Sequence, residues 1–159
     1  MKIKIRLLLS LFFYSLITVN INAQKTDSLK LQSLLAQAVE CYHQNEFEKC
    51  RDLCLQIIAI DSTRGDAYLL IGADYAAAVN DCADNEFIKG MIYCLAVDNF
   101  EKAKEIDPSL SEKADGFIKV YSNYFPSGES GDVWDGPVPG QKFKIGCWIN
   151  EETIVRFRD

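Results

Sequence analysis

The chain has 159 residues, with 17 Lys and Arg against 23 Asp and Glu, and it contains one histidine. Its net charge of −6 repels phosphate backbones, so the composition argues against a nucleic acid partner. A lone histidine without a G-x-S-x-G or H-E-x-x-H motif supplies neither a catalytic triad nor a zinc-protease site. The sequence therefore predicts a protein that is not an enzyme, with no catalytic residue, cofactor or metal.

The N-terminus has the three parts of a secretory signal. Lys2, Lys4 and Arg6 precede an apolar run at residues 7–19, and small Ala23 provides a cleavage point. The run is shorter than the roughly 20 residues of a membrane-spanning helix, which disfavours the alternative of an uncleaved anchor. Residues 1–23 are thus predicted to be removed, and the mature form to be periplasmic or secreted and not membrane-spanning. Cleavage leaves 14 basic residues against 23 acidic ones, a net charge of −9.

Six cysteines in an exported chain permit disulfides, and they can be fully paired in 15 ways. Two local interpretations are open. Cys82 with Cys94 would staple the segment between them, and Cys41 could instead meet Cys50 or Cys54 across a helical hairpin. The remaining cysteine is Cys147.

Residues 24–125 have helical periodicity and repeat. Apolar residues recur every three or four positions over 29–60, and residues 45–46 interrupt them, which predicts two antiparallel helices. A second unit begins at residues 64–66. Leu34 and Tyr68 lie 34 residues apart, as do Ala38 and Gly72, and this is the period of tetratricopeptide (TPR) repeats.

The second unit resembles the TPR family most closely. Its matching residues are Tyr68, Ile71, Gly72 and Tyr75 in the first helix, then Ala96, Phe100, Ala103 and the closing Asp107-Pro108 in the second. The first unit departs from the pattern at Gln37, Cys54 and Ser62, and the second carries an insertion at about 80–91, part of which extends its second helix backwards. Small residues are expected where helix axes approach closely, at Ala38, Cys50, Gly72 and Ala96.

The remaining chain completes the predicted architecture. Residues 110–124 form an amphipathic helix that would cap the stack, and 126–140 form a loop. Residues 141–159 predict a β-hairpin with strands at 142–149 and 153–158. A lone hairpin is marginal, so it must pack on the helices, add a strand at 132–134, or pair with another chain. The predicted fold is mainly α: two TPR-type hairpins and a capping helix, an α-solenoid fragment, followed by a C-terminal β-hairpin. This layout resembles short exported bacterial TPR proteins.

The resemblance implies that the first helix of each pair lines a concave groove. The groove residues would be Gln32, Leu35, Val39, Tyr42, His43, Asp66, Leu69, Ala73, Ala76 and Ala77. Family members that grip a C-terminal carboxylate use Lys, Asn and Arg there, and this chain has apolar residues instead. We therefore expect an exported adaptor whose groove binds a helix or an extended peptide of a protein partner. The competing interpretation is that the chain's own tail, with Trp134 and Trp148, fills the groove.

Two further hypotheses concern the cysteines and the hairpin. Cys41, His43, Cys50 and Cys54 have the composition of a metal or redox module. However, Cys41 and His43 are two apart on a helix and point in different directions, so buried core thiols are the favoured interpretation. The free edge of the hairpin could alternatively drive self-association by strand addition.

Overall fold

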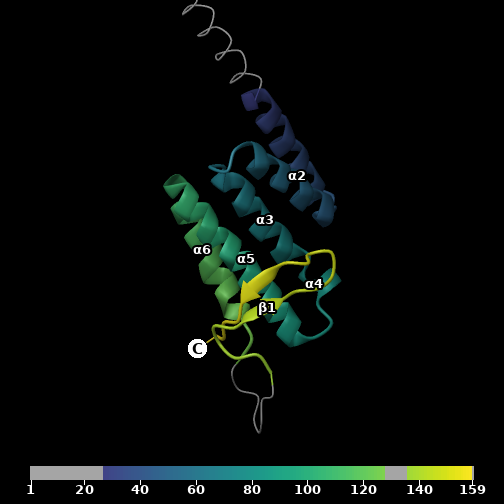
Figure 1. The fold of residues 1–159 in the computed structure, drawn as a ribbon, viewed down its shortest axis with the longest axis vertical. Coiled ribbons are helices and arrows are strands. Elements are labelled where there is room, and N and C mark those ends of the chain that lie inside the picture. The colour runs from purple at the N-terminus through teal and green to yellow at the C-terminus, as the bar shows by residue number, and fades with distance from the viewer. Residues whose placement is uncertain (1–26, 128–135, 159) are drawn as a thin grey trace, which may run out of the picture.

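The computed structural model describes residues 27–127 and 136–158. The chain is mainly helical, with a small two-stranded antiparallel sheet near its C-terminal end, as the sequence predicts (Figure 1). The predicted signal segment 1–23, the candidate third strand 132–134 and Trp134 lie outside the described residues. Within the described ranges, no helix combines the length and apolar content needed to cross a bilayer.

The first helical pair consists of residues 27–43 and α2 (Phe47–Ile60). Asn45, with φ of 60°, reverses the chain between them, because a short polar residue tolerates the left-handed region at a helix end. Each helix buries one stripe: Leu31, Leu34, Ala38 and Cys41 on the first, and Phe47, Cys50, Cys54 and Ile57 on α2. The predicted helix pair is present, with the interruption where the sequence places it.

The second pair consists of α3 (Gly65–Ala77) and α5 (Glu86–Ile106), with the short α4 (Val79–Cys82) between them. Asn85 caps α5, since its side-chain oxygen accepts from the Ile88 amide at 2.9 Å. The start of α5 at Glu86 confirms the expectation that the insertion extends the second helix backwards. α3 lies along α5, and their buried residues form the centre of the core.

Both second helices end in the same local structure. Asp61 follows α2, and its carboxylate accepts from Thr63 at 3.0 Å (amide) and 2.6 Å (hydroxyl). Asp107 follows α5, and its carboxylate accepts from Ser109 at 3.0 Å (amide) and 2.6 Å (hydroxyl). Such side-chain turns stop a helix by offering the backbone another hydrogen-bond partner. The two pairs therefore share their exits, although Ser62 replaces the proline of the second unit.

Gly72 sits where α3 and α5 touch. A Cβ placed on it would lie 2.6 Å from the Phe100 ring and 2.8 Å from the Ala96 carbonyl oxygen. Backbone cannot retreat as a flexible side chain can, so the pair of helices would have to separate. The close approach that the sequence assigns to Gly72 is confirmed.

Gly72→Ala is therefore expected to destabilise the protein by about 1–3 kcal/mol, the usual cost of overpacking. Gly116 in α6 (Ser111–Tyr121) is the matched control, because a Cβ there meets nothing within 4 Å. Gly116→Ala should raise stability by up to about 1 kcal/mol through helix propensity. Chemical denaturation of both variants measures the two changes, and a loss of stability in Gly116→Ala equal to that in Gly72→Ala would contradict the packing argument.

α6 covers the outer side of α5 and is flanked by single turns at Pro108–Leu110 and Ser122–Tyr124. The rings of Phe117 and Tyr121 stack on the buried ring of Phe100, and their centroids lie 4.9 Å and 5.8 Å, respectively, from the Phe100 centroid. Offset ring pairs of this kind add to the stabilisation from burial itself. The helix predicted at 110–124 is present, split into a short helix and its flanking turns.

The hairpin is shorter than the sequence predicts. β1 (Lys142–Lys144) pairs with β2 (Glu152–Ile154), and Phe143 lies opposite Thr153. The predicted extension of the first strand to residue 149 is wrong, because Cys147 and Asn150 adopt positive φ and coil the chain between the strands. Strands of three residues offer few backbone groups to another chain, which disfavours self-association by strand addition.

Candidate functional site

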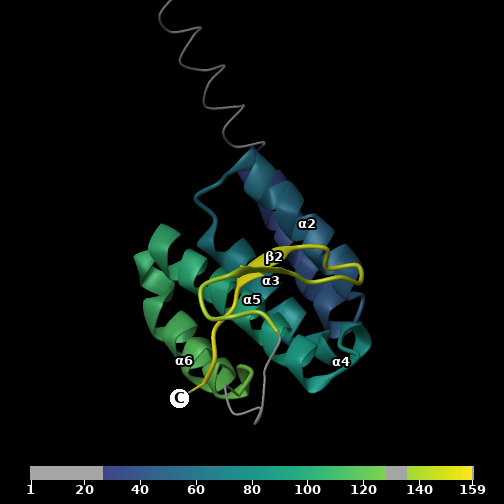
Figure 2. The same cartoon turned by 60° about the horizontal axis from the view of Figure 1, so that its bottom comes forward.

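The C-terminal segment folds back over the helices, and we refer to residues 136–158 as the strap. Figure 2 shows the strap crossing α3 and α5 and reaching towards α2 and α4. Ile145, Ile149 and Val155 are buried in the common core. The strap is thus an integral part of the folded body, and this supplies the packing that a two-stranded hairpin needs.

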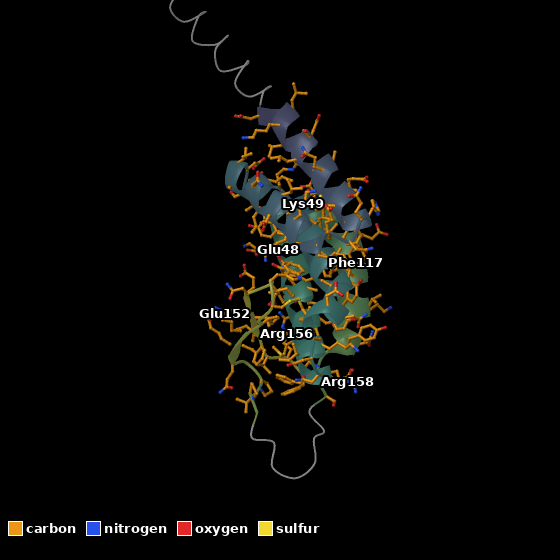
Figure 3. The ribbon with its side chains drawn as sticks, turned by 90° about the vertical axis from the view of Figure 1, so that its right-hand side faces the viewer. Glu48, Lys49, Phe117, Glu152, Arg156 and Arg158 are labelled. Carbon is orange, nitrogen blue, oxygen red and sulfur yellow. A yellow bond between two sulfur atoms is a disulfide. The ribbon has the colours of Figure 1, made fainter. Side chains whose placement is uncertain are left out.

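The base of the strap is held on α5 by polar contacts. Arg156 forms an ion pair with Asp98, and the Thr153 hydroxyl donates to the same carboxylate at 2.5 Å. Figure 3 shows Arg156 between the hairpin, marked by Glu152, and the helices. Burial lowers the pKa of the Arg156 guanidinium, and burial also raises the pKa of the Cys94 thiol to about 11. Cys94 is therefore a neutral thiol at physiological pH, donating to the Arg156 carbonyl at 3.7 Å.

The tip of the strap, residues 145–151, is held by an arginine and two aromatic rings. The Arg51 guanidinium lies 5.1 Å from the centre of the Trp148 ring and donates to the Trp148 carbonyl. Tyr75 of α3 approaches the same ring at 5.9 Å between centroids. Cation–π and ring contacts are worth about 1 kcal/mol each at partly exposed sites. Trp148 thus joins the tip to both α2 and α3.

A disulfide between Cys82 and Cys147 fixes the tip to α4, with the Cα atoms 5.5 Å apart. A disulfide, which the sequence permits, is therefore present, but neither of the two pairings considered from the sequence occurs. Cys94 is buried beneath the base of the strap, and Cys41, Cys50 and Cys54 are free buried thiols. A separation of 65 residues carries no local sequence signal, so only the fold could identify the partners.

The interface between α2 and α3 contains a carboxyl group without a hydrogen-bond partner. Asp74 is completely buried, and neither of its oxygens has a partner at hydrogen-bond distance and angle among the described residues. Burial raises the pKa of Asp74 to about 7, a rise that the Cys50 thiol and the charge of Arg51 only partly oppose. A buried polar group of this kind is costly, most of all when it is ionised.

The thiols beside Asp74 do not form an activated pair. The pKa of Cys50 is raised by its contact with the Cys54 thiol and by burial. Thiols act as nucleophiles and metal ligands in their thiolate form, which this environment disfavours. Among residues 27–127 and 136–158, no group of three or more His, Cys, Asp or Glu side chains is placed to hold a metal ion. Cys50 and Cys54 act here as small core residues.

The predicted groove residues differ in how far they are exposed. Leu69 and Ala76 are buried in the core, with 6% and 7% of their surface exposed. Val39 is 38% exposed, and Leu35, Tyr42 and Ala73 are half-buried. The polar and terminal members, Gln32, His43, Asp66 and Ala77, lie at least partly in solvent. The His43 and Tyr42 rings pack in a T-shaped arrangement with their centroids 5.7 Å apart, and Asp66 is paired with Arg64.

A hollow of about 570 Å³ lies beside the strap tip. Its lining includes Trp148 and four carboxylates, those of Glu46, Glu48, Asp52 and Asp81, with Lys49 as a basic neighbour. Three of these carboxylates are paired, Glu46 with Lys49 and both Glu48 and Asp52 with Arg51. The surface next to the disulfide is therefore acidic.

Sequence reasoning missed the residues that receive the strap. Arg51, Tyr75 and Asp98 carry its principal polar and ring contacts. Tyr75 matches the repeat pattern as a core residue, and the two charged residues look like ordinary exposed helix positions. Comparison with protein-family models, curated proteins and solved structures finds no match.

Proposed function

We propose that the mature protein is an exported, non-enzymatic adaptor of the TPR type, which binds a helical or extended segment of a protein partner along the first helix and α3. The observation that carries this proposal is where the strap docks. The contacts of Trp148 and Arg156 described above go to α2, to α5 and to Tyr75 near the end of α3. The groove residues Val39 and Ala77 stay exposed.

Repetition supports the TPR part of the proposal. The two helical pairs have matching exits at Asp61 and Asp107, and Gly72 makes the close helix contact of the family pattern. Stacked helical pairs present long, shallow surfaces suited to peptides rather than to small substrates. The half-buried side chains of Leu35, Tyr42 and Ala73 would supply apolar contact area to a partner helix.

Export is proposed from the sequence of residues 1–23, and the Cys82–Cys147 disulfide supports it, because disulfides persist in oxidising compartments. The alternative of a cysteine module built on Cys41, Cys50 and Cys54 is less well supported. All three are buried, and the environment of Cys50 favours its neutral form.

Val39→Lys is expected to weaken partner binding by about tenfold or more, because it places a charge in an apolar contact. The measurement is site-specific photo-crosslinking in envelope extracts, followed by an affinity assay with the captured protein. Leu55 on α2 is the matched control, since it is a similarly exposed aliphatic residue (45%) outside the proposed groove. A probe at position 39 should capture a partner that a probe at 55 does not. Equal capture at both positions, or unchanged affinity in Val39→Lys, would count against the groove.

A further inference from the structure

We propose that the Cys82–Cys147 disulfide is a thiol–disulfide exchange site, at which an external thiol attacks Cys147 and releases Cys147 and Trp148 at the strap tip while the strap base stays on α5. This inference goes beyond the adaptor function and does not depend on it. It rests on the exposure of the disulfide, on the separate contacts of tip and base, and on the charges around the bond.

Exposure directs the attack. The Cys147 residue is exposed and Cys82 is half-buried, whereas the free thiols of Cys41, Cys50, Cys54 and Cys94 are buried. Exchange requires a thiolate to reach one sulfur in line with the bond that breaks. Among the described cysteines, the sulfur of Cys147 is therefore the one that solvent-borne thiols meet first.

The step balances as an ordinary exchange. The external thiolate forms a bond to the Cys147 sulfur, the Cys82–Cys147 bond breaks, and Cys82 leaves as a thiolate that takes a proton from water. One equivalent of a monothiol gives a mixed disulfide on Cys147, and a second equivalent can attack it to free Cys147 and form the oxidised monothiol. With a dithiol, the second thiol attacks this mixed disulfide, so that the dithiol is oxidised by two electrons and both cysteines become free thiols.

Release is local because the two ends of the strap are held differently. The base keeps the Arg156–Asp98 ion pair, the Thr153 hydrogen bond and buried Val155. Within the tip, Ile145 and Ile149 stay buried in the core, whereas Cys147 and Trp148 between them are held by the disulfide and by the Arg51 and Tyr75 contacts of Trp148. The contacts of Trp148 are individually weak, and without the covalent link residues 146–148 must be ordered at their own entropic cost. Opening uncovers the Arg51–Tyr75 surface.

Charge selects the thiol. Asp81 adjoins Cys82 and lines the same hollow as Trp148, where the other three carboxylates are paired with Lys49 or Arg51. Carboxylates within about 10 Å of the reacting sulfur repel an anionic reagent at low salt and attract a cationic one. The site is thus suited to a neutral or positively charged thiol, such as a cysteine flanked by basic residues.

The test begins with the oxidised protein and three thiols at equal thiolate concentration: cationic cysteamine, neutral 2-mercaptoethanol and anionic 3-mercaptopropionate. After quenching with iodoacetamide, mass spectrometry locates alkylated thiols and mixed disulfides. We expect reaction without denaturant, the adduct on Cys147, and alkylation of Cys82 but not of the four buried cysteines. When each rate is divided by that thiol's rate with a small uncharged disulfide, which corrects for intrinsic nucleophilicity, cysteamine should react at least about threefold faster than the anionic thiol, with a gap that narrows at high salt and in Asp81→Asn. Adducts mainly on Cys82, a need for denaturant, or equal rates would overturn the proposal.

The local opening has its own readout in Trp148 fluorescence, measured in a Trp134→Phe background. Reduction should shift the emission to longer wavelength and increase quenching by acrylamide, while amide exchange around Asp98 stays unchanged. The Cys82→Ser/Cys147→Ser variant should give the open spectrum with and without reductant. Unchanged Trp148 emission on reduction, or loss of protection throughout α5, would show that the disulfide does not control the tip alone.

Discussion

Replacing Cys82 and Cys147 together by serine is expected to lower the free energy of unfolding by about 2–4 kcal/mol. The disulfide closes a loop with a sequence separation of 65 residues, which contains all of α5 and α6. Cutting it frees this loop in the unfolded chain, and the chain-entropy estimate for such a length is about 4 kcal/mol. Denaturant titration of the oxidised protein and the variant measures the difference.

The control for this experiment is the reduced wild-type protein. It should lose about as much stability as the serine variant, and the serine variant should be insensitive to reductant. The folded helical content should remain, because the core of α3, α5 and α6 does not contain the disulfide. Equal free energies of unfolding for the oxidised and reduced proteins would contradict the prediction, because the disulfide would then not stabilise the fold by restricting the unfolded chain.

Wild-type protein is expected to become less stable as the pH rises from about 4 to about 7, and Asp74→Asn should abolish this part of the pH dependence. Asp74 has a pKa of about 7 in the folded protein, against an ordinary value of 3.8. The folded state therefore binds the proton more tightly than the unfolded state. Its stabilising effect is complete below the unfolded pKa and is lost as the pH rises through the folded one.

The size of this change in the free energy of unfolding follows from the pKa shift of Asp74. About three pKa units correspond to roughly 4 kcal/mol, which we take as an upper bound because relaxation around a buried carboxylate lowers the cost. The measurement is unfolding by denaturant between pH 4 and 8, with Asp81→Asn as an exposed control. The asparagine amide would be buried at the same place and change the stability at every pH, so the slope of stability against pH is diagnostic and the absolute stability is not. Parallel pH curves for the wild type and Asp74→Asn would refute the assignment.

Much of the helical fold could be predicted because its signals are local. The stripes on residues 27–43 and α2 follow helical spacing, and the break at Asn45 is a turn residue in a left-handed conformation. Gly72 could be assigned to a close contact because only a residue without a side chain fits there. The backward extension of α5 followed from apolar residues at helical spacing after the Asn85 cap.

The hairpin illustrates where local patterns fail. Alternation over residues 142–149 predicts one long strand, and the structure stops it at Lys144. The alternation of apolar residues does not predict the positive φ of Cys147 and Asn150. It accompanies a disulfide to α4 and the docking of Trp148 on Arg51, which are contacts between segments far apart in the chain.

The sequence by itself determined the helical pairs, their turns and the hairpin's existence, because each depends on residues within a few positions of one another. Only the tertiary structure decided which cysteines pair, that Asp74 is buried with no hydrogen-bond partner among the residues described, and that the strap lies over Arg51, Tyr75 and Asp98. Those outcomes depend on which surfaces meet when apolar stripes are buried together. Hydrophobic periodicity predicts which face of each helix or strand is buried, but it does not predict which other element packs against that face.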